Sequence, residues 1–237
     1  LEIGCGLGAI TIPAAKKAAR LVAVEKDAQL LDLLRTELAV QQLSNVELVH
    51  QDILTINFAD YFGPETPSAI VIGNLPYNIS SQIIVLLIAS RAYIRRALLM
   101  LQKEMAQRLI ASPGNRDYGR LSVMLQYGNE VKVVAEAPAN LFYPRPKVDS
   151  QVISVTTKEH IPYPADDEQM LSRVVKAGFS QRRKTLRNAL AGNILNADHA
   201  QVESWLARAD IDSRRRAETL AVEEFVRLAN LISRDGG

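Results

Sequence analysis

The chain has 237 residues, 48% of them hydrophobic and 23% charged, which excludes a disordered or fibrous protein and suffices for one large and one small domain. The formal net charge of +2 excludes a uniformly basic surface, so attraction to nucleic acid has to come from local patches. The longest apolar run, 83–89, is too short to cross a bilayer and no signal peptide opens the chain, so we expect a cytoplasmic protein without membrane contact. The single cysteine and three scattered histidines offer no ligand spacing, so no metal is expected.

Apolar runs alternate with segments of helical periodicity through the first part of the chain. The runs that predict buried parallel strands are 21–24, 46–49, 69–72 and 97–101, and the helical segments are 10–18, 28–40, 80–90 and 104–111. This alternation predicts an α/β fold with a doubly wound, Rossmann-like sheet. Leu1 to Ile3 resembles the tail of a first strand, so we expect the N-terminal part of the sheet to be absent from this sequence.

The pattern changes in the second part of the chain. The β-rich stretches 130–136 and 150–157 have no predicted helix between them and predict an antiparallel edge hairpin. Beyond Ile161-Pro162-Tyr163-Pro164, helices are predicted at 168–179, 182–191, 200–208 and 222–232. We therefore expect an α/β domain over residues 1–160 and a small all-helical domain over residues 161–237.

A glycine turn, Gly4-Cys5-Gly6-Leu7-Gly8, follows the first strand and precedes a helix. Glycines at such a turn let a ligand approach the backbone, although close packing of helix on strand explains them about equally well. The spacing is tighter than the dinucleotide fingerprint, and the turn has no basic residue. This favours a nucleoside ligand without phosphates.

Two acidic residues end the next two predicted strands. Glu25 is placed where a carboxylate can accept both ribose hydroxyls, and Asp52 where it can accept from an adenine amino group with Ile53 beside the ring. Taken singly, each is more often an ordinary solvated carboxylate.

The tetrapeptide Asn74-Leu75-Pro76-Tyr77 stands directly behind the fourth predicted strand. An exocyclic amine is a poor nucleophile because its lone pair is delocalised, and acceptors for its N–H bonds draw the nitrogen toward tetrahedral geometry. The Asn74 side-chain oxygen and the Leu75 carbonyl are the predicted acceptors, Pro76 fixes the turn, and Tyr77 stacks on the base. In isolation such a tetrapeptide is more often a simple turn. Behind a glycine turn and two strand-end acids on one sheet edge, it predicts an S-adenosylmethionine site with an acceptor amine beside it.

The chain closely resembles the ribosomal RNA adenine dimethyltransferases over nearly its whole length. The motifs that carry the resemblance are Glu2 to Gly8, Glu25, Gln51-Asp52, Asn74 to Ser80, Leu101 to Glu104, Tyr118 to Ser122, Asn140 to Ser150 and Phe179 to Arg187. Family members also carry a Gln-Asn-Phe-Leu motif ahead of the glycine turn. This sequence lacks that motif, which indicates that its N-terminal segment is not represented, and Cys5 replaces the proline that is most common there.

The resemblance implies a class I S-adenosylmethionine-dependent methyltransferase. It would dimethylate the N6 amines of two adjacent adenosines near the 3′ end of 16S ribosomal RNA, within the immature small subunit. The sequence does not indicate an oligomeric state, and a monomer is the default expectation. Phe142 would close the face of the base opposite Tyr77. The residues expected around the cofactor are Glu2, Gly4, Gly6, Gly8, Glu25, Lys26, Asp52, Ile53 and Asn74.

A stretch without acidic residues runs from Gln169 to Ala197. We expect Arg182, Arg183, Lys184 and Arg187 to bind RNA phosphates from a helix that starts near Arg182. The competing interpretation is a solvated helix face whose long side chains cover apolar surface. A second cluster, Arg214 to Arg216, is balanced by nearby acids and is weaker.

Three alternatives remain open from the sequence. One is a 23S ribosomal RNA adenine N6-methyltransferase of the macrolide-resistance type. Another is a methyltransferase of the same fold that acts on DNA adenine or protein glutamine. The third is a noncatalytic ribosome-assembly or transcription factor that keeps the fold. Intact Gly4, Glu25, Asp52 and Asn74 argue for retained catalysis.

Overall fold

The computed structural model describes residues 1–63, 68–143, 145–192 and 194–235. The chain forms two compact units, each with its own core. The first, called here the sheet unit, contains residues 1–106 and 130–157, and the second, the helical unit, contains residues 107–129 and those from 158 onward. The sequence predicted one boundary near residue 160, whereas the structure also groups 107–129 with the helices.

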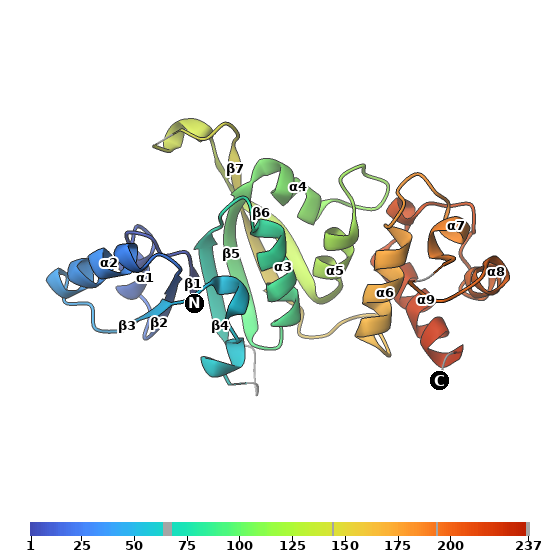
Figure 1. Ribbon diagram of the computed structural model, residues 1–237, viewed down its shortest axis with the longest axis horizontal. Coiled ribbons are helices and arrows are strands. Elements are labelled where there is room, and N and C mark those ends of the chain that lie inside the picture. Colours follow the sequence, from blue (N-terminus) through green and yellow to red (C-terminus); the bar gives the residue numbers. More distant parts are fainter. Residues whose placement is uncertain (64–67, 144, 193, 236–237) are drawn as a thin grey trace. The chain divides into compact units, whose positions relative to one another are not determined.

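The described strands of the sheet unit form one seven-stranded sheet in the order β3-β2-β1-β4-β5-β7-β6 (Figure 1). The strands are β1 (Glu2–Ile3), β2 (Leu21–Glu25), β3 (Val46–His50), β4 (Ala69–Asn74), β5 (Ile94–Gln102), β6 (Asn129–Ala137) and β7 (Ser150–Thr157). β1 to β5 pair in parallel, which confirms the doubly wound prediction, and β7 is antiparallel to β5. β7 thus lies inside the sheet between β5 and β6, so of the two predicted hairpin strands only β6 is at the edge.

Helices α1 (Thr11–Ala15), α2 (Ala28–Val40) and α3 (Ser80–Ala89) connect the parallel strands. Asp27 caps α2 by accepting a hydrogen bond from the Gln29 N–H at 2.8 Å. Leu31, Leu34 and Leu38 of α2 pack with Ala23 and Cys5. α3 lies in front of the sheet in Figure 1, and the short 3₁₀ helices are η1 (Ile53–Thr55), η2 (Phe58–Asp60) and η3 (Ala139–Leu141). These connections bring the carboxyl ends of the first four strands to one edge.

The helical unit contains α5 (Arg120–Gly128), α6 (Glu168–Gly178), α7 (Leu186–Leu190), α8 (His199–Arg208), η4 (Ala217–Thr219) and α9 (Val222–Asp235), while α4 (Lys103–Ile110) runs from the sheet unit into it. Tyr118, Leu171 and Phe225 are fully buried in its core. The sequence analysis recognised Tyr118 to Ser122 as a motif but did not predict α5. A side-chain cap starts this helix, because the Gly119 N–H donates to the Ser122 hydroxyl at 3.0 Å.

The prediction of a helix from Arg182 was wrong, since α7 begins at Leu186. The N–H groups of Leu186 and Arg187 donate to the carbonyls of Arg215 and Ser213, so the free donors at this helix start are satisfied by another segment. Arg182, Arg183 and Lys184 lie in the preceding turn, closed by a 2.9 Å hydrogen bond from the Lys184 N–H to the Gln181 carbonyl.

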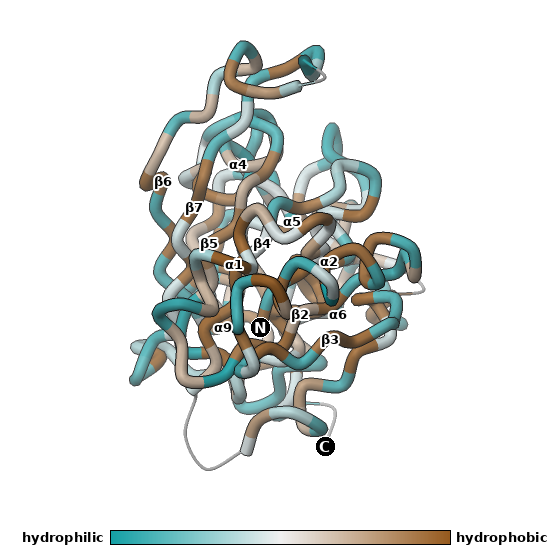
Figure 2. The backbone as a smooth tube through the Cα atoms, turned by 90° about the vertical axis from the view of Figure 1, so that its left-hand side faces the viewer, coloured by the Kyte–Doolittle hydropathy of each residue, from teal (hydrophilic) through white to brown (hydrophobic). Residues whose placement is uncertain are grey.

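Hydrophobic stretches alternate with hydrophilic ones along the chain (Figure 2). Within the described residues, no helix combines the length and apolar character needed to cross a membrane.

Candidate active site

A pocket of ≈ 350 Å³ opens at the carboxyl edge of the sheet. Its volume falls within the range of small-molecule sites. Strands β1 to β4 each contribute, through the strand end or the residues just beyond it. The lining residues are Ile3, Gly4, Val24, Glu25, Lys26, Gln51, Asp52, Ile53, Asn74, Pro76, Asn78 and Ile79. The predicted Gly4, Glu25, Lys26, Asp52, Ile53 and Asn74 are therefore brought together.

The glycine turn is held to strand β2, because the N–H groups of Gly4 and Cys5 both donate to the Val24 carbonyl. Gly4, Gly6 and Gly8 all have positive φ, at 69°, 52° and 90°. A Cβ at Gly4 or Gly6 would meet open space, whereas one at Gly8 would lie 2.5 Å from Leu34 Cδ1. Both interpretations of the turn therefore apply, at different residues: Gly8 serves packing, while Gly4 leaves bare backbone at the pocket.

The Glu25 carboxylate is already bonded to the backbone. Its Oε2 accepts from the Gly6 N–H at 3.1 Å, and its Oε1 accepts from the N–H groups of Lys26 and Asp27 at 2.8 and 3.0 Å. A carboxylate has about four lone-pair positions, so one position on Oε2 remains for a ligand. In this arrangement Glu25 can accept one hydroxyl, whereas the sequence prediction assigned it two.

Asp52 forms an ion pair with Lys26, another lining residue, whose Nζ lies 2.9 Å from Asp52 Oδ2. Asp52 Oδ1 accepts the Leu54 N–H at 3.0 Å and so caps η1. The Lys26 hydrogen bond, followed by the bond from Leu54, lowers the pKa of Asp52 below its ordinary value. Asp52 is thus held as an anion at the end of β3, and the buried Ile53 lies beside it.

Glu2 does not line the pocket, although the sequence analysis placed it among the cofactor residues. It is 1% exposed in the central strand β1, and burial raises its pKa. Its Oε2 has no hydrogen-bond partner among the described residues. Gly6 and Gly8 also lie outside the lining, because the turn presents Gly4 alone to the pocket.

The turn after β4 is anchored by the residues that follow Asn74. The Leu75 N–H donates to the Met100 carbonyl at 3.0 Å, and the Ser80 hydroxyl lies 3.0 Å from the carbonyls of both Pro76 and Tyr77. Asn74 itself is exposed, and its carboxamide makes no hydrogen bond to any other described residue. The turn therefore presents an unused amide to the pocket on a fixed backbone.

The two predicted aromatic residues belong to different segments of the same sheet edge. The Tyr77 ring is 41% exposed, and its hydroxyl is 3.1 Å from Ser150 Oγ at the start of β7. Phe142 directly follows η3 in the loop from β6 to β7 and is half-buried. Neither Tyr77 nor Phe142 lines the pocket, and Pro144 of the motif that contains Phe142 lies outside the described residues.

The four cations predicted to bind RNA have different surroundings in the helical unit. The Arg182 guanidinium donates to the carbonyls of Arg116 and Tyr118, and Arg187 pairs with Glu203 at 3.1 Å. Arg183 and Lys184 are exposed and form no ion pair or side-chain hydrogen bond with the described residues. Arg214 and Arg215 of the weaker cluster pair with Asp212 and Glu224.

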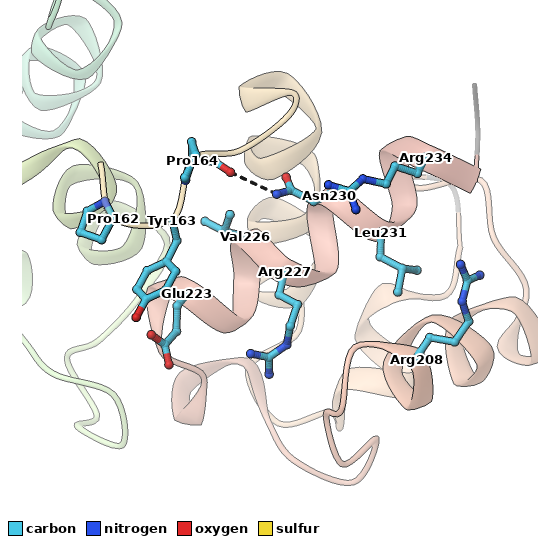
Figure 3. A pocket seen from close by; sticks show the side chains of 10 residues that line it. All are labelled: Pro162, Tyr163, Pro164, Arg208, Glu223, Val226, Arg227, Asn230, Leu231 and Arg234. Atoms are coloured by element: carbon cyan, nitrogen blue, oxygen red, sulfur yellow. Dashed lines mark hydrogen bonds between the residues drawn. The ribbon is translucent and has the colours of Figure 1, made fainter. Parts of the chain in front are cut away.

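A second pocket, of ≈ 660 Å³, lies in the helical unit and was not predicted from the sequence (Figure 3). Most of its polar groups are bonded within the unit: Arg208 pairs with Asp235, Arg234 pairs with Asp166, and Asn230 donates to the Pro164 carbonyl at 3.1 Å. The side chains of Tyr163 and Glu223 form no hydrogen bond or ion pair with the described residues. Although larger, this pocket is lined by none of the site residues predicted from the sequence. No group of side chains suited to a metal ion is found in the described part of the chain.

Comparison with known proteins agrees with the site. The family model described as ribosomal RNA adenine dimethylase matches residues 1–234. "Ribosomal RNA small subunit methyltransferase A" of Desulforapulum autotrophicum is 53% identical over 98% of this chain and 81% of its own length.

Two solved structures share the fold. A dimethyladenosine transferase from Plasmodium falciparum has a TM-score of 0.81 at 24% identity, covering 99% of this chain and 90% of its own. The 23S rRNA methyltransferase ErmE has a TM-score of 0.69 at 25% identity, covering 98% and 89%. By its family match and its relatives, and with the site at its sheet edge, the chain belongs to the ribosomal RNA adenine dimethylase family.

Proposed function

We propose that this protein uses S-adenosylmethionine to dimethylate the N6 amines of two adjacent adenosines near the 3′ end of 16S ribosomal RNA. The substrate is the immature small ribosomal subunit, and the enzyme acts as a cytoplasmic monomer. The observation that carries the proposal is the exposed Asn74 carboxamide, which is not bonded to other described residues and lines a pocket with Gly4, Glu25 and Asp52. The 53% identity to a small-subunit methyltransferase supports this choice of RNA.

The residues present fit S-adenosylmethionine. The bare backbone at Gly4, the free position on Glu25 and the Asp52 carboxylate suit a nucleoside without phosphates, and the glycine turn beside the pocket has no basic residue. When bound, S-adenosylmethionine supplies an electrophilic methyl group on a sulfonium. Glu25 would hold the ribose, and Asp52 and Ile53 the adenine.

The turn from Asn74 to Tyr77, called here the acceptor turn, places the target amine and stabilises the charge that develops on it, without covalent catalysis. The Asn74 oxygen and the Leu75 carbonyl accept the two N6 hydrogens and draw the lone pair out of the ring. Tyr77 and Phe142 enclose the base, which must leave its stack to reach the site. The proton leaves to water after transfer, because no histidine or aspartate stands in the tetrapeptide.

RNA contact outside the pocket involves Arg183 and Lys184, whose charges are not neutralised by the described residues. Arg182 and Arg187 contribute less, because both side chains already bond to the helical unit. Phosphates would bind these cations whatever the RNA sequence. The adenine would be selected by Tyr77 and Phe142, which together form the base clamp.

The test is methyl transfer from tritiated S-adenosylmethionine to immature small subunits that lack the modification, followed by mapping of dimethyladenosine. The expected product is two adjacent dimethyladenosines in 16S RNA. Label in large-subunit RNA would instead support the 23S activity of ErmE, whose fold this chain shares. Absence of transfer by the full-length protein would favour a noncatalytic assembly factor.

A further inference from the structure

The Tyr77 hydroxyl is tied to a buried serine. It lies 3.1 Å from Ser150 Oγ, and Ser150 is 1% exposed in β7, where it pairs with Gln102 of β5. Stacking on a base uses the ring alone, so the hydroxyl is not needed for that contact. A hydrogen bond from a rigid strand to the tip of a partly exposed ring instead restricts the ring's orientation.

The residue before this serine holds the other aromatic segment. Asp149 Oδ1 accepts the Ala139 N–H at 2.9 Å, at the first residue of η3. The Asp149 carbonyl accepts the Lys103 N–H at 2.9 Å, which ties the same residue to the end of β5. Within η3 the Phe142 N–H bonds back to the Ala139 carbonyl at 3.3 Å, so the carboxylate fixes the turn from which Phe142 emerges.

We infer that the neighbouring residues Asp149 and Ser150 are positioning residues for the two aromatic walls of the acceptor site. Ser150 orients Tyr77 through its hydroxyl, and Asp149 orients Phe142 through η3. Because the two residues are adjacent at the start of one paired strand, the spacing between the walls is set by the sheet. This inference rests on the proposed role of Tyr77 and Phe142 as a base clamp.

A double-mutant cycle tests the serine. The turnover number and KM for small subunits are measured for the unaltered protein, Ser150→Ala, Tyr77→Phe and the double variant. Each single change should lower kcat about three- to tenfold, the range for removal of one hydrogen bond, and the double variant should be no slower than the slower single one. Multiplying effects would overturn the inference, as would full activity in both single variants.

Ser154→Ala is the matched control for the cycle. Ser154 is also buried in β7, at 5% exposure, and its hydroxyl accepts from Arg96 Nε at 3.0 Å, away from Tyr77. Its kcat should stay within twofold of the unaltered protein. An equal loss in this control would show that any buried serine of β7 matters only for folding.

The aspartate is tested with 2-aminopurine at a target position that is unstacked in the free RNA, so that stacking between the aromatic walls quenches its fluorescence. Asp149→Ala should lose most of the quenching at saturating protein while the RNA Kd stays within twofold. Asp149→Asn keeps an acceptor for the Ala139 N–H and should restore the quenching, which separates positioning from loss of charge. Unchanged quenching in Asp149→Ala, or no restoration by asparagine in a folded protein, would overturn the inference. If the unaltered protein itself neither methylates nor quenches, the proposed function fails instead.

Discussion

At the carboxyl edge of the sheet unit the Asn74 carboxamide has no hydrogen-bond partner among the described residues, whereas in the helical unit two of the four predicted RNA-binding cations bond to the unit itself. Both regions were selected from the sequence by residue type and spacing. The turn after Asn74 is anchored by bonds from the Leu75 N–H and the Ser80 hydroxyl, while the Asn74 side chain stays available. The comparison shows that a polar residue becomes a candidate for function when its own surroundings do not satisfy it.

The largest expected effect is at the unsatisfied amide. Asn74→Ala should lower the single-turnover rate of methyl transfer about a hundred- to thousandfold, as when one preorganised group is removed from an electrostatic site. RNA affinity should change less than about threefold, because this side chain binds no phosphate. Rates from rapid quench and affinities from filter binding measure the two. Parallel losses of rate and affinity would mean that Asn74 has a structural role. The contrast between an available side chain at the sheet edge and bonded cations in the helical unit would then no longer hold.

The next effect separates the two kinds of glycine. Gly8→Ala places a methyl against the fully buried Leu34 at a φ of 90° and should lower the free energy of unfolding by about 2–4 kcal/mol. Gly6→Ala meets open space at a φ of 52° and should cost about 1 kcal/mol. Urea denaturation followed by circular dichroism measures both. Equal losses in the free energy of unfolding would mean that Leu34 can move aside for a methyl group at Gly8.

A smaller effect should distinguish Arg182 from its neighbours Arg183 and Lys184 in the turn before α7. Arg182→Ala should lower the free energy of unfolding by about 1 kcal/mol, because its bonds to the carbonyls of Arg116 and Tyr118 are removed. The double change of Arg183 and Lys184 to alanine should leave stability within about 0.5 kcal/mol. It should weaken RNA binding and reduce the salt slope by about 0.7–0.9 for each phosphate that the variant no longer binds. If Arg182→Ala instead reduced the salt slope more than the double variant did, Arg182 would be the main RNA contact and the roles assigned to these residues would be wrong.

The smallest effect concerns pH. Lys26 lowers the pKa of Asp52, so the carboxylate stays charged at acidities where an ordinary aspartate is protonated. Cofactor binding that needs this carboxylate weakens as pH falls through the pKa. Lys26→Met raises that pKa, so the weakening should begin at a higher pH, with little change near neutrality.

Calorimetric titration with S-adenosylhomocysteine across the acidic range measures the shift. Lys132→Met removes another exposed ion pair of the sheet unit, with Glu130 at 2.8 Å and away from the pocket lining, and serves as the control. If both variants shift alike, the cause is net charge and not the ion pair with Asp52.

Much of the sheet unit was predictable because its signals are local. Apolar runs identified β2, β4 and β5, and the run 46–49, interrupted by Glu47, identified β3, which is an edge strand without a buried residue although a buried one was predicted. Helix α2 was predicted with its observed bounds, 28–40, since Asp27 supplies a cap and the leucines a helical period. The errors occur where a distant segment decides the outcome. α7 starts late because the carbonyls of Ser213 and Arg215 satisfy its first N–H groups, and β7 is internal because it pairs with β5.

Neighbouring residues alone were enough to establish the alternation of strands and helices in the first part of the chain, the carboxyl edge that gathers Gly4, Glu25, Asp52 and Asn74, and the resemblance to the dimethylase family. Periodicity, turn chemistry and motif spacing can be read along one dimension. The folded chain was needed to show which side chains are already bonded: three of the Glu25 lone-pair positions, the Arg182 guanidinium and the Tyr77 hydroxyl. Such bonds join residues up to 73 positions apart in the chain, as between Tyr77 and Ser150, and depend on how separate elements pack.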